Sequence, residues 1–176
     1  MQPERTGEKG HWLQSPGVYP PALLRLDSEA GSIMWYTEPR YQMLYTTEAI
    51  GLPAASVWLP ALLWKATATE LYVFALSGTD RPTAETPLYH APLFNVYSDG
   101  RVCMGTVDRP DTARLRSAAE CMAQWEHRFF HSYFSHTNHA CTKSALIPLL
   151  HRLIHQEEPF PANELLPTRK TVQDLC

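Results

Sequence analysis

The feature that most constrains this chain is the order of its apolar patterns, because strand-like runs come first and helix-like spacing follows only after residue 111. The early runs are short and rich in aromatic and branched residues, which suit a pleated, half-buried surface. Expected strands cover 33–36, 41–45, 61–66 and 71–76. Since strands and helices are grouped rather than alternating, the sequence predicts an α+β fold in which an antiparallel meander precedes the helices.

Three segments refine this expectation. The run 71–76 is apolar throughout, which predicts a place in the middle of the sheet. Residues 77–92 are punctuated by proline and are expected to form a loop that leads from the sheet to the active site. The segment 21–26 is compatible with a short strand or with one helical turn.

Two helices are expected in the second half of the chain. The first spans about 112–133, with Asp111 or Thr112 as N-cap, and carries an apolar stripe of Leu115, Ala118, Met122, Trp125 and Phe129. The second follows Ser144 and tolerates Pro148 in its first turn. Its inward-facing residues are expected to be Leu146, Leu149, Leu150 and Leu153. Such stripes are typical of core packing.

Length and composition predict one folded unit. A chain of 176 residues with 44% hydrophobic content can bury one good core. The expected organisation is a flexible arm over 1–20, a single domain over 21–156 and an irregular, proline-punctuated tail over 157–176.

Charge and cysteine usage argue against several classes of function. A net charge of -3 disfavours nucleic acid or an anionic membrane as an obligate partner. No apolar run approaches the roughly 18–20 residues that span a bilayer, and residues 1–20 lack the apolar centre of a signal peptide. The cysteines at 103, 121, 141 and 176 form no CxxC pair, which indicates free thiols in a reducing cytoplasm.

The run 93–104 carries the candidate chemistry. Asn95 stands eight residues before Cys103, with an Asp99-Gly100 pair between them that favours a tight turn. A thiol placed this way can carry an acyl group, and a neighbouring amide can stabilise the oxyanion formed when that group is transferred. The alternative interpretation is a β-hairpin with an inert, half-buried cysteine.

This spacing resembles the active-site region of ubiquitin-conjugating enzymes, in which the Asn of a His-Pro-Asn tripeptide stands eight residues before the acceptor cysteine. Asn95 and Cys103 match those two positions, whereas Leu93 and Phe94 replace the His and Pro. Much of 31–140 resembles one bacterial family, PRTRC system protein B. The matching segments are 71–76, 81–82, 86–89, 91–92, 94–97, 125, 129–130, 132 and 134–136.

The resemblance implies a ubiquitin-conjugating-like fold and a carrier function. An adenylating enzyme of the ubiquitin-activating kind would pass the C-terminus of a ubiquitin-like protein to Cys103, and an amine of a target protein, a lysine, would then attack the thioester. No metal or cofactor is implied. The relatives suggest a gene neighbourhood with that activating enzyme, the ubiquitin-like protein and a JAB-type metal isopeptidase. The family's opening amphipathic helix has no counterpart in residues 1–30.

Roles for the neighbouring residues follow from their chemistry. Asn95 is expected to donate to the oxyanion, to hold the loop before Cys103 as an Asx-turn residue, or to do both. Asp99 and Gly100 support the turn, and Arg101 is the nearest fixed positive charge. A general base for the attacking amine could come from segments that flank the site, with Asp108, His136, Asn138 and His139 as candidates.

Other functions stay open at this point. A catalytically silent module that binds a ubiquitin-like protein or scaffolds a plasmid-associated complex is favoured by the missing His-Pro and opening helix, and opposed by the cysteine at the correct spacing. A cysteine hydrolase is disfavoured because no His/Asp pattern accompanies Cys103. Zinc ligation is disfavoured because there is no HExxH pattern among the clustered candidates His127, His131, His136, His139 and Cys141.

Overall fold

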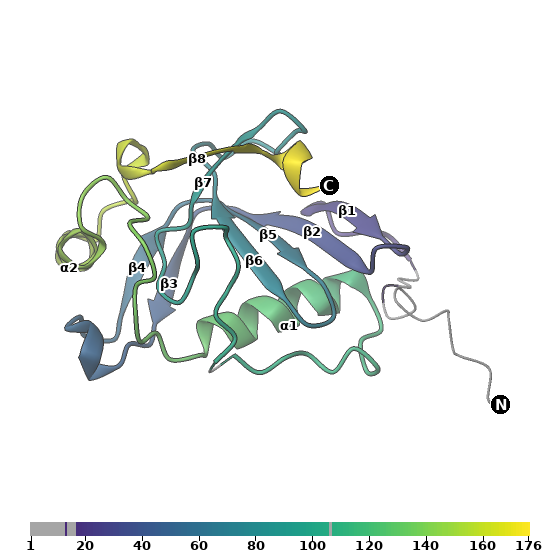
Figure 1. Ribbon diagram of the computed structural model, residues 1–176, viewed down its shortest axis with the longest axis horizontal. Coiled ribbons are helices and arrows are strands. Elements are labelled where there is room, and N and C mark those ends of the chain that lie inside the picture. Colours follow the sequence, from purple (N-terminus) through teal and green to yellow (C-terminus); the bar gives the residue numbers. More distant parts are fainter. Residues whose placement is uncertain (1–12, 14–16, 106) are drawn as a thin grey trace.

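The computed structural model describes residues 13, 17–105 and 107–176 (Figure 1). The strands are β1 (Leu23–Asp27), β2 (Ser32–Thr37), β3 (Arg40–Leu44), β4 (Ala55–Leu59), β5 (Leu62–Ala66), β6 (Leu71–Ala75), β7 (Pro87–His90) and β8 (Pro167–Thr171). The helices are α1 (Ala118–Phe130) and α2 (Leu146–Gln156), and short 3-10 turns cover Glu48–Ile50, Ala162–Glu164 and Val172–Leu175. Six strands form one antiparallel sheet in the order β1-β2-β5-β6-β7-β8, and β3 pairs with β4.

One long hairpin contributes to both sheets: its first arm consists of β2 and β3, and its second arm consists of β4 and β5. Thr37 lies opposite Leu62 where the β2–β5 ladder ends, and Arg40 lies opposite Leu59 where the β3–β4 ladder begins. The register is therefore the same on both sides of a gap that contains Pro39 and Pro60. Proline has no backbone N–H to donate, so the ladder of hydrogen bonds is interrupted at this gap.

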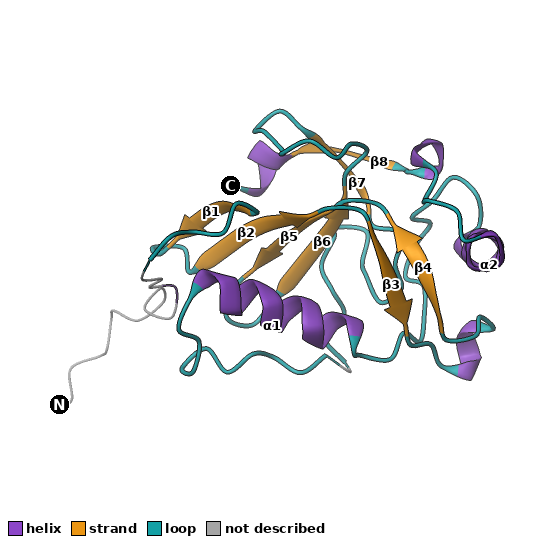
Figure 2. Cartoon of the chain, turned by 180° about the vertical axis from the view of Figure 1, so that it is seen from behind, coloured by secondary structure: helices purple, strands orange, loops and turns teal. Residues whose placement is uncertain are grey.

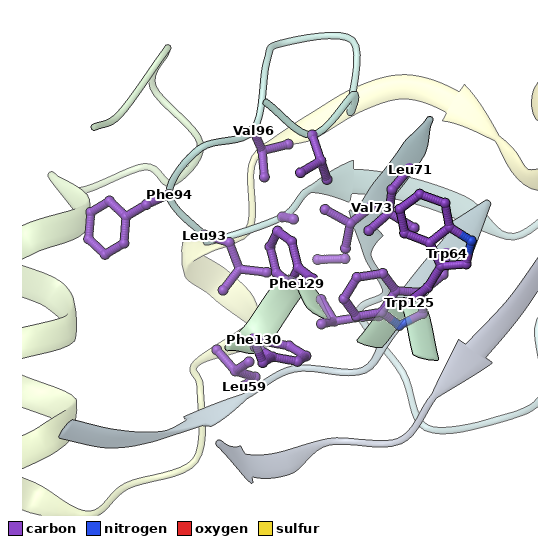
Figure 3. Packing of buried hydrophobic residues seen from close by; sticks show 14 of the residues in the cluster. Leu59, Trp64, Leu71, Val73, Leu93, Phe94, Val96, Trp125, Phe129 and Phe130 are labelled. Atoms are coloured by element: carbon purple, nitrogen blue, oxygen red, sulfur yellow. The ribbon is translucent and has the colours of Figure 1, made fainter. Parts of the chain in front are cut away.

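The main core lies between α1 and one face of the six-stranded sheet (Figure 2). Trp35 of β2 and Trp64 of β5 stack with ring centroids 6.1 Å apart. Trp64 then meets Phe129 of α1 edge-on at 5.5 Å, and Figure 3 shows both rings in this cluster. Each fully buried aromatic ring contributes on the order of 1.5–3 kcal/mol, so this contact holds α1 firmly on the sheet.

A polar clamp fixes the orientation of α1. Glu126 accepts one hydrogen bond from the indole N–H of Trp35 and another from Arg40, each at 2.8 Å. The Arg40 guanidinium also lies over the Phe130 ring, 4.8 Å from its centroid. Trp35 is on β2 and Arg40 is on β3. The clamp therefore ties α1 to the part of the long hairpin in the six-stranded sheet and to the part in the two-stranded sheet.

The C-terminal segment covers the opposite face of the sheet. A second cluster there contains Phe74, Leu88 and Val172, and Lys65 donates a 2.6 Å hydrogen bond to the carbonyl of Leu175. The prediction of an irregular tail over 157–176 was therefore wrong, because this segment forms β8 along β7. The prediction of a loop over 77–92 was correct for residues 77–86 and wrong for residues 87–90, which form β7.

The helices agree with expectation better in their packing than in their boundaries. α1 begins at Ala118 rather than near residue 112, because Ser117 and not Asp111 or Thr112 caps it, accepting a 3.1 Å hydrogen bond from the N–H of Glu120. In α2, Pro148 lies in the first turn as expected, and the four leucines predicted to face inward are buried. In the described part of the chain no helix is long and apolar enough to cross a membrane.

The strands at 33–36, 41–45, 61–66 and 71–76 are confirmed as β2, β3, β5 and β6, and β6 lies inside the sheet. The undecided segment 21–26 belongs largely to strand β1. β4 was not expected. Most of the arm expected over 1–20 lies outside the described residues.

Candidate active site

The expected turn before Cys103 is confirmed as the tip of a short hairpin. Val96 lies opposite Val102, and the backbone N–H of Tyr97 donates a 2.8 Å hydrogen bond to the carbonyl of Arg101. Gly100 then donates to the carbonyl of Tyr97 at 2.9 Å. Gly100 has a φ of 89°, a conformation that glycine adopts without the steric cost of a side chain.

Backbone hydrogen bonds join this hairpin to the sheet beside β6. Val73 donates to the carbonyl of Gly100 at 2.9 Å, and Val102 donates to the carbonyl of Leu71 at 2.8 Å. The other half of β6 pairs with β7, where Phe74 lies opposite His90. The strand that leads to Cys103 is therefore a continuation of the sheet edge, held by the same strand that supports β7.

Gly100 packs directly on the ring of Phe74. A Cβ atom added at Gly100 would lie 2.2 Å from the Phe74 ring, closer than atoms can approach without a shift. Phe74 is itself 1% exposed and belongs to the cluster under the C-terminal segment. The tip of the hairpin is thus fixed by packing as well as by hydrogen bonds.

Cys103 follows the hairpin strand and is half-buried, whereas Cys121 and Cys141 are buried. Its backbone N–H donates a 2.7 Å hydrogen bond to the carbonyl of Asn95, which fixes the distance between the two candidate residues. A Cβ atom at Gly105 would lie 3.9 Å from the Cys103 sulfur, in ordinary contact. Glycine at 105 therefore leaves one approach to the sulfur free of a side chain.

Tyr97 contacts the thiol and was not among the residues expected from the sequence. A hydrogen bond between its hydroxyl and the Cys103 side chain is the largest cause that raises the pKa of Tyr97. The Arg101 guanidinium lies over the Tyr97 ring, 4.8 Å from its centroid, and its Nε is 3.9 Å from a carboxylate oxygen of Asp99. No pattern in the sequence pointed to this contact, because it depends on the register of the folded hairpin.

Asn95 is 3% exposed, and its side chain is bound to the loop that follows α1. Its Nδ2 donates to the carbonyl of Tyr133 at 3.1 Å. Its Oδ1 accepts from the backbone N–H groups of Ser135 at 3.1 Å and His136 at 3.2 Å. Asn95 also has a φ of 58°, in the left-handed region that asparagine tolerates better than most residues. The segment before Cys103 and the loop over 133–136 are therefore tied together through this side chain, and the backbone N–H of Asn95 also donates to the carbonyl of His136 at 2.9 Å.

A histidine pair connects β7 to the segment that follows the loop over 133–136. Nε2 of His139 lies 3.1 Å from Nδ1 of His90, which ends β7. Burial, followed by the neighbouring His139, lowers the pKa of His90. His136 is half-buried and its Nδ1 lies 2.8 Å from the hydroxyl oxygen of Ser135, so it stands next to the Asn95 contacts.

Asp108 and the two histidines at the end of α1 line a hollow that includes neither Asn95 nor Cys103. Asp108 is exposed and lines a polar hollow of about 340 Å³ together with Gln124, His127, Arg128 and His131. The rings of His127 and His131 stack at 3.9 Å. Among the residues that the structure describes, no group of three or more His, Cys, Asp or Glu side chains is placed to hold a metal ion.

Leu93 and Phe94 occupy the two positions before Asn95 and belong to the core. They are 2% and 0% exposed. Figure 3 shows Leu93 directed toward Phe129, whereas Phe94 points to the other side of the segment. This pair anchors the active-site segment by burial on both sides and brings no polar group to the site.

Alkylation rates should distinguish the cysteines. Burial raises the pKa of Cys121 to about 12 and that of Cys141 to about 11, so both thiols are almost wholly protonated at neutral pH. Maleimide is therefore expected to modify Cys103 well before either of them. A Cys176→Ser background removes the remaining exposed thiol, and peptide mapping locates the label. Equal protection of Cys103 and Cys121 would contradict an accessible acceptor.

A family model described as prokaryotic E2 family D matches residues 7–168, which covers most of the chain. No curated protein and no solved structure matches the chain significantly.

Proposed function

The chain belongs to prokaryotic E2 family D, and from this membership we propose that Cys103 carries the C-terminus of a ubiquitin-like protein as a thioester. The observation that supports this most directly is the partial exposure of Cys103 at the end of an anchored hairpin, eight residues after Asn95. An E2-like family implies interaction with ubiquitin-like proteins and with activating enzymes of the E1 kind. The acceptor is an amine, a lysine of a target protein.

The proposed transfer consists of two exchanges at one carbonyl carbon. In loading, the Cys103 sulfur bonds to the C-terminal carbonyl carbon of the modifier, the bond to the activating enzyme's sulfur breaks, and the Cys103 proton ends on that leaving thiol. In discharge, the amine nitrogen bonds to the same carbon, the C–S bond breaks, and a proton from the amine returns to Cys103. Both exchanges pass through a tetrahedral oxyanion that fixed donors stabilise, but in loading the activating enzyme supplies much of the site, whereas in discharge this chain must stabilise the oxyanion largely by itself.

Asn95 is proposed first as a positioning residue. Its hydrogen bonds to Tyr133, Ser135 and His136 hold the segment whose carbonyl binds the Cys103 backbone. The bond to Tyr133 uses one of the two Nδ2 hydrogens, and donation to the oxyanion would have to use the other. Asp108 and His136 remain proposed as bases for the attacking amine, with His136 next to the Asn95 contacts.

Tyr97 is proposed as a hydrogen-bond donor at the reacting centre, because its hydroxyl already contacts the Cys103 side chain. Tyr97→Phe removes that hydroxyl and keeps the ring under Arg101. Discharge to amines is expected to slow roughly tenfold or more, while loading changes less than about twofold. Single-turnover rates measure both steps, with Tyr19→Phe as the control at an exposed position. Unchanged discharge in Tyr97→Phe would remove this role.

The narrower proposal is that this chain belongs with PRTRC system protein B, a bacterial and cytoplasmic branch. The shared segments include the whole of β6, most of β7 and the run 94–97 before the turn. Its activating enzyme and ubiquitin-like protein would then be encoded nearby, and these are the proteins to use in reconstitution.

A silent binding module is the second candidate. It is favoured by the buried Leu93 and Phe94 in place of His and Pro, since neither supplies a polar group beside Cys103. Intact-protein mass spectrometry after incubation with the candidate activating enzyme, ubiquitin-like protein and ATP separates the two. A carrier gains the mass of the modifier minus one water, and only when ATP is present. A silent module binds the modifier in solution yet keeps its own mass.

A further inference from the structure

An aromatic pair that includes no residue of the candidate active site is exposed on the small sheet of β3 and β4. Tyr41 of β3 and Trp58 of β4 lie directly opposite each other, with ring centroids 5.6 Å apart. They are 49% and 36% exposed. Two large aromatic side chains paired on the outer face of a hairpin expose apolar area that gains free energy when a partner covers it.

A pocket of about 180 Å³ adjoins this pair. Trp58 forms part of its wall, together with Pro39 and Pro60 from the gap in the long hairpin, Leu76 after β6, and Pro159 and Phe160 after α2. These segments are far apart in the sequence and converge on one largely apolar depression. Tryptophan, tyrosine and proline side chains of this kind are typical of surfaces that bind extended peptides.

Three exposed carboxylates stand next to residues of the pocket wall in the chain. Glu38, Asp80 and Glu158 are all exposed, and each is the chain neighbour of a residue in the pocket wall, namely Pro39, Thr79 and Pro159. No ion pair within the described residues involves any of the three. These three carboxylates, here called the acidic rim, therefore favour a cationic partner.

We propose that the Tyr41–Trp58 surface and the adjoining pocket bind an extended segment of another protein in which a large apolar residue is flanked by lysine or arginine. The apolar residue enters the pocket, the aromatic pair contacts the neighbouring backbone and side chains, and the basic residues lie against the acidic rim. Because no pocket residue belongs to the Cys103 site, such a partner can remain bound while Cys103 is loaded or discharged.

A phage-displayed random dodecapeptide library provides the probe, since it does not assume the partner. Selection on the wild-type protein is expected to give a large apolar or aromatic residue with lysine or arginine on both sides. The best peptide, labelled with fluorescein, then gives dissociation constants by anisotropy. A selection without that pattern, or with acidic flanks, would overturn the proposal.

Gly78 offers a position where a large side chain can be added at the pocket wall. It belongs to the pocket wall, and a Cβ atom built there meets no atom within 4 Å. Gly78→Phe is expected to weaken peptide binding by about tenfold or more, whereas Gly78→Ala changes it less than about twofold. Equal binding by Gly78→Phe and wild type would show that the peptide lies elsewhere and overturn the proposal.

Charge reversal tests the rim separately. The combined variant Glu38→Lys, Asp80→Lys and Glu158→Lys is expected to weaken binding about tenfold at low salt, and by much less at 0.5 M salt, as an order-of-magnitude expectation from screening. The matched control reverses three exposed acids that do not adjoin the pocket wall, Glu29→Lys, Glu48→Lys and Glu85→Lys. Equal losses in both triple variants would mean unspecific attraction and overturn the proposal.

Docking here needs nothing from the thiol. Cys103→Ala is therefore expected to bind the peptide as tightly as wild type, so peptide binding tests the surface independently of thioester formation. Loss of peptide binding in Cys103→Ala would place the peptide at the active site and overturn the separation of the two surfaces.

Discussion

Asn95→Ala is expected to lower the free energy of unfolding by about 2–4 kcal/mol, because it removes all the side-chain hydrogen bonds by which Asn95 holds the loop over 133–136. The N–H groups of Ser135 and His136 and the carbonyl of Tyr133 all lose a hydrogen bond at once. Alanine must also adopt the positive φ at this position, which it tolerates less well than asparagine. Urea denaturation measures the loss.

Asn138→Ala is the matched control, since Asn138 is exposed in the same part of the chain, and a change below about 0.5 kcal/mol is expected there. The same Asn95 variant separates the two roles proposed for this residue. A positioning role impairs loading and discharge alike. Donation to the oxyanion instead leaves loading intact and slows discharge by about 2–4 kcal/mol in activation free energy. Unchanged stability in Asn95→Ala would contradict the positioning role.

Gly100→Ala is expected to cost about 2–4 kcal/mol of stability, through a strained backbone and a steric clash together. The φ of 89° is unfavourable for alanine, and the new methyl group would start 2.2 Å from the Phe74 ring. Either the hairpin leaves β6 or the ring moves within its cluster. Thermal and urea unfolding measure the effect, and Gly78→Ala is the control at a glycine with open space around it.

A double-mutant cycle with Phe74→Leu isolates the clash. Leucine removes the ring that Gly100 packs against, so the cost of Gly100→Ala is expected to be smaller in that background. Equal costs in both backgrounds would mean that backbone strain alone explains the effect, and that the contact between Gly100 and Phe74 does not hold the hairpin.

Local chemistry made part of this architecture predictable. The Asp99-Gly100 turn needs only a residue that accepts a positive φ, and the inward leucines of α2 follow from helical spacing alone. β6 was predictable as an interior strand because it is apolar on both faces. The α+β class followed from the order of these patterns.

Non-local pairing explains what the sequence did not reveal. β8 exists because it pairs with β7, some 80 residues earlier, and its own residues are largely exposed and show no apolar alternation. At the site, the spacing of Asn95 and Cys103 was visible, but the partners of the Asn95 amide come from about 40 residues later. The contact of Tyr97 with the thiol likewise depends on the hairpin register, which only the folded chain defines.

The bond formed at residue 103 tests the central claim most directly. Wild-type protein, Cys103→Ser and Cys103→Ala are incubated with the activating enzyme, the ubiquitin-like protein and ATP, and each product is then treated with an excess of thiol and weighed by mass spectrometry. The account predicts a wild-type adduct that the thiol removes, a Cys103→Ser adduct that survives as an ester, and no adduct in Cys103→Ala. An adduct that persists in Cys103→Ala, or a wild-type adduct that resists thiol, would contradict it.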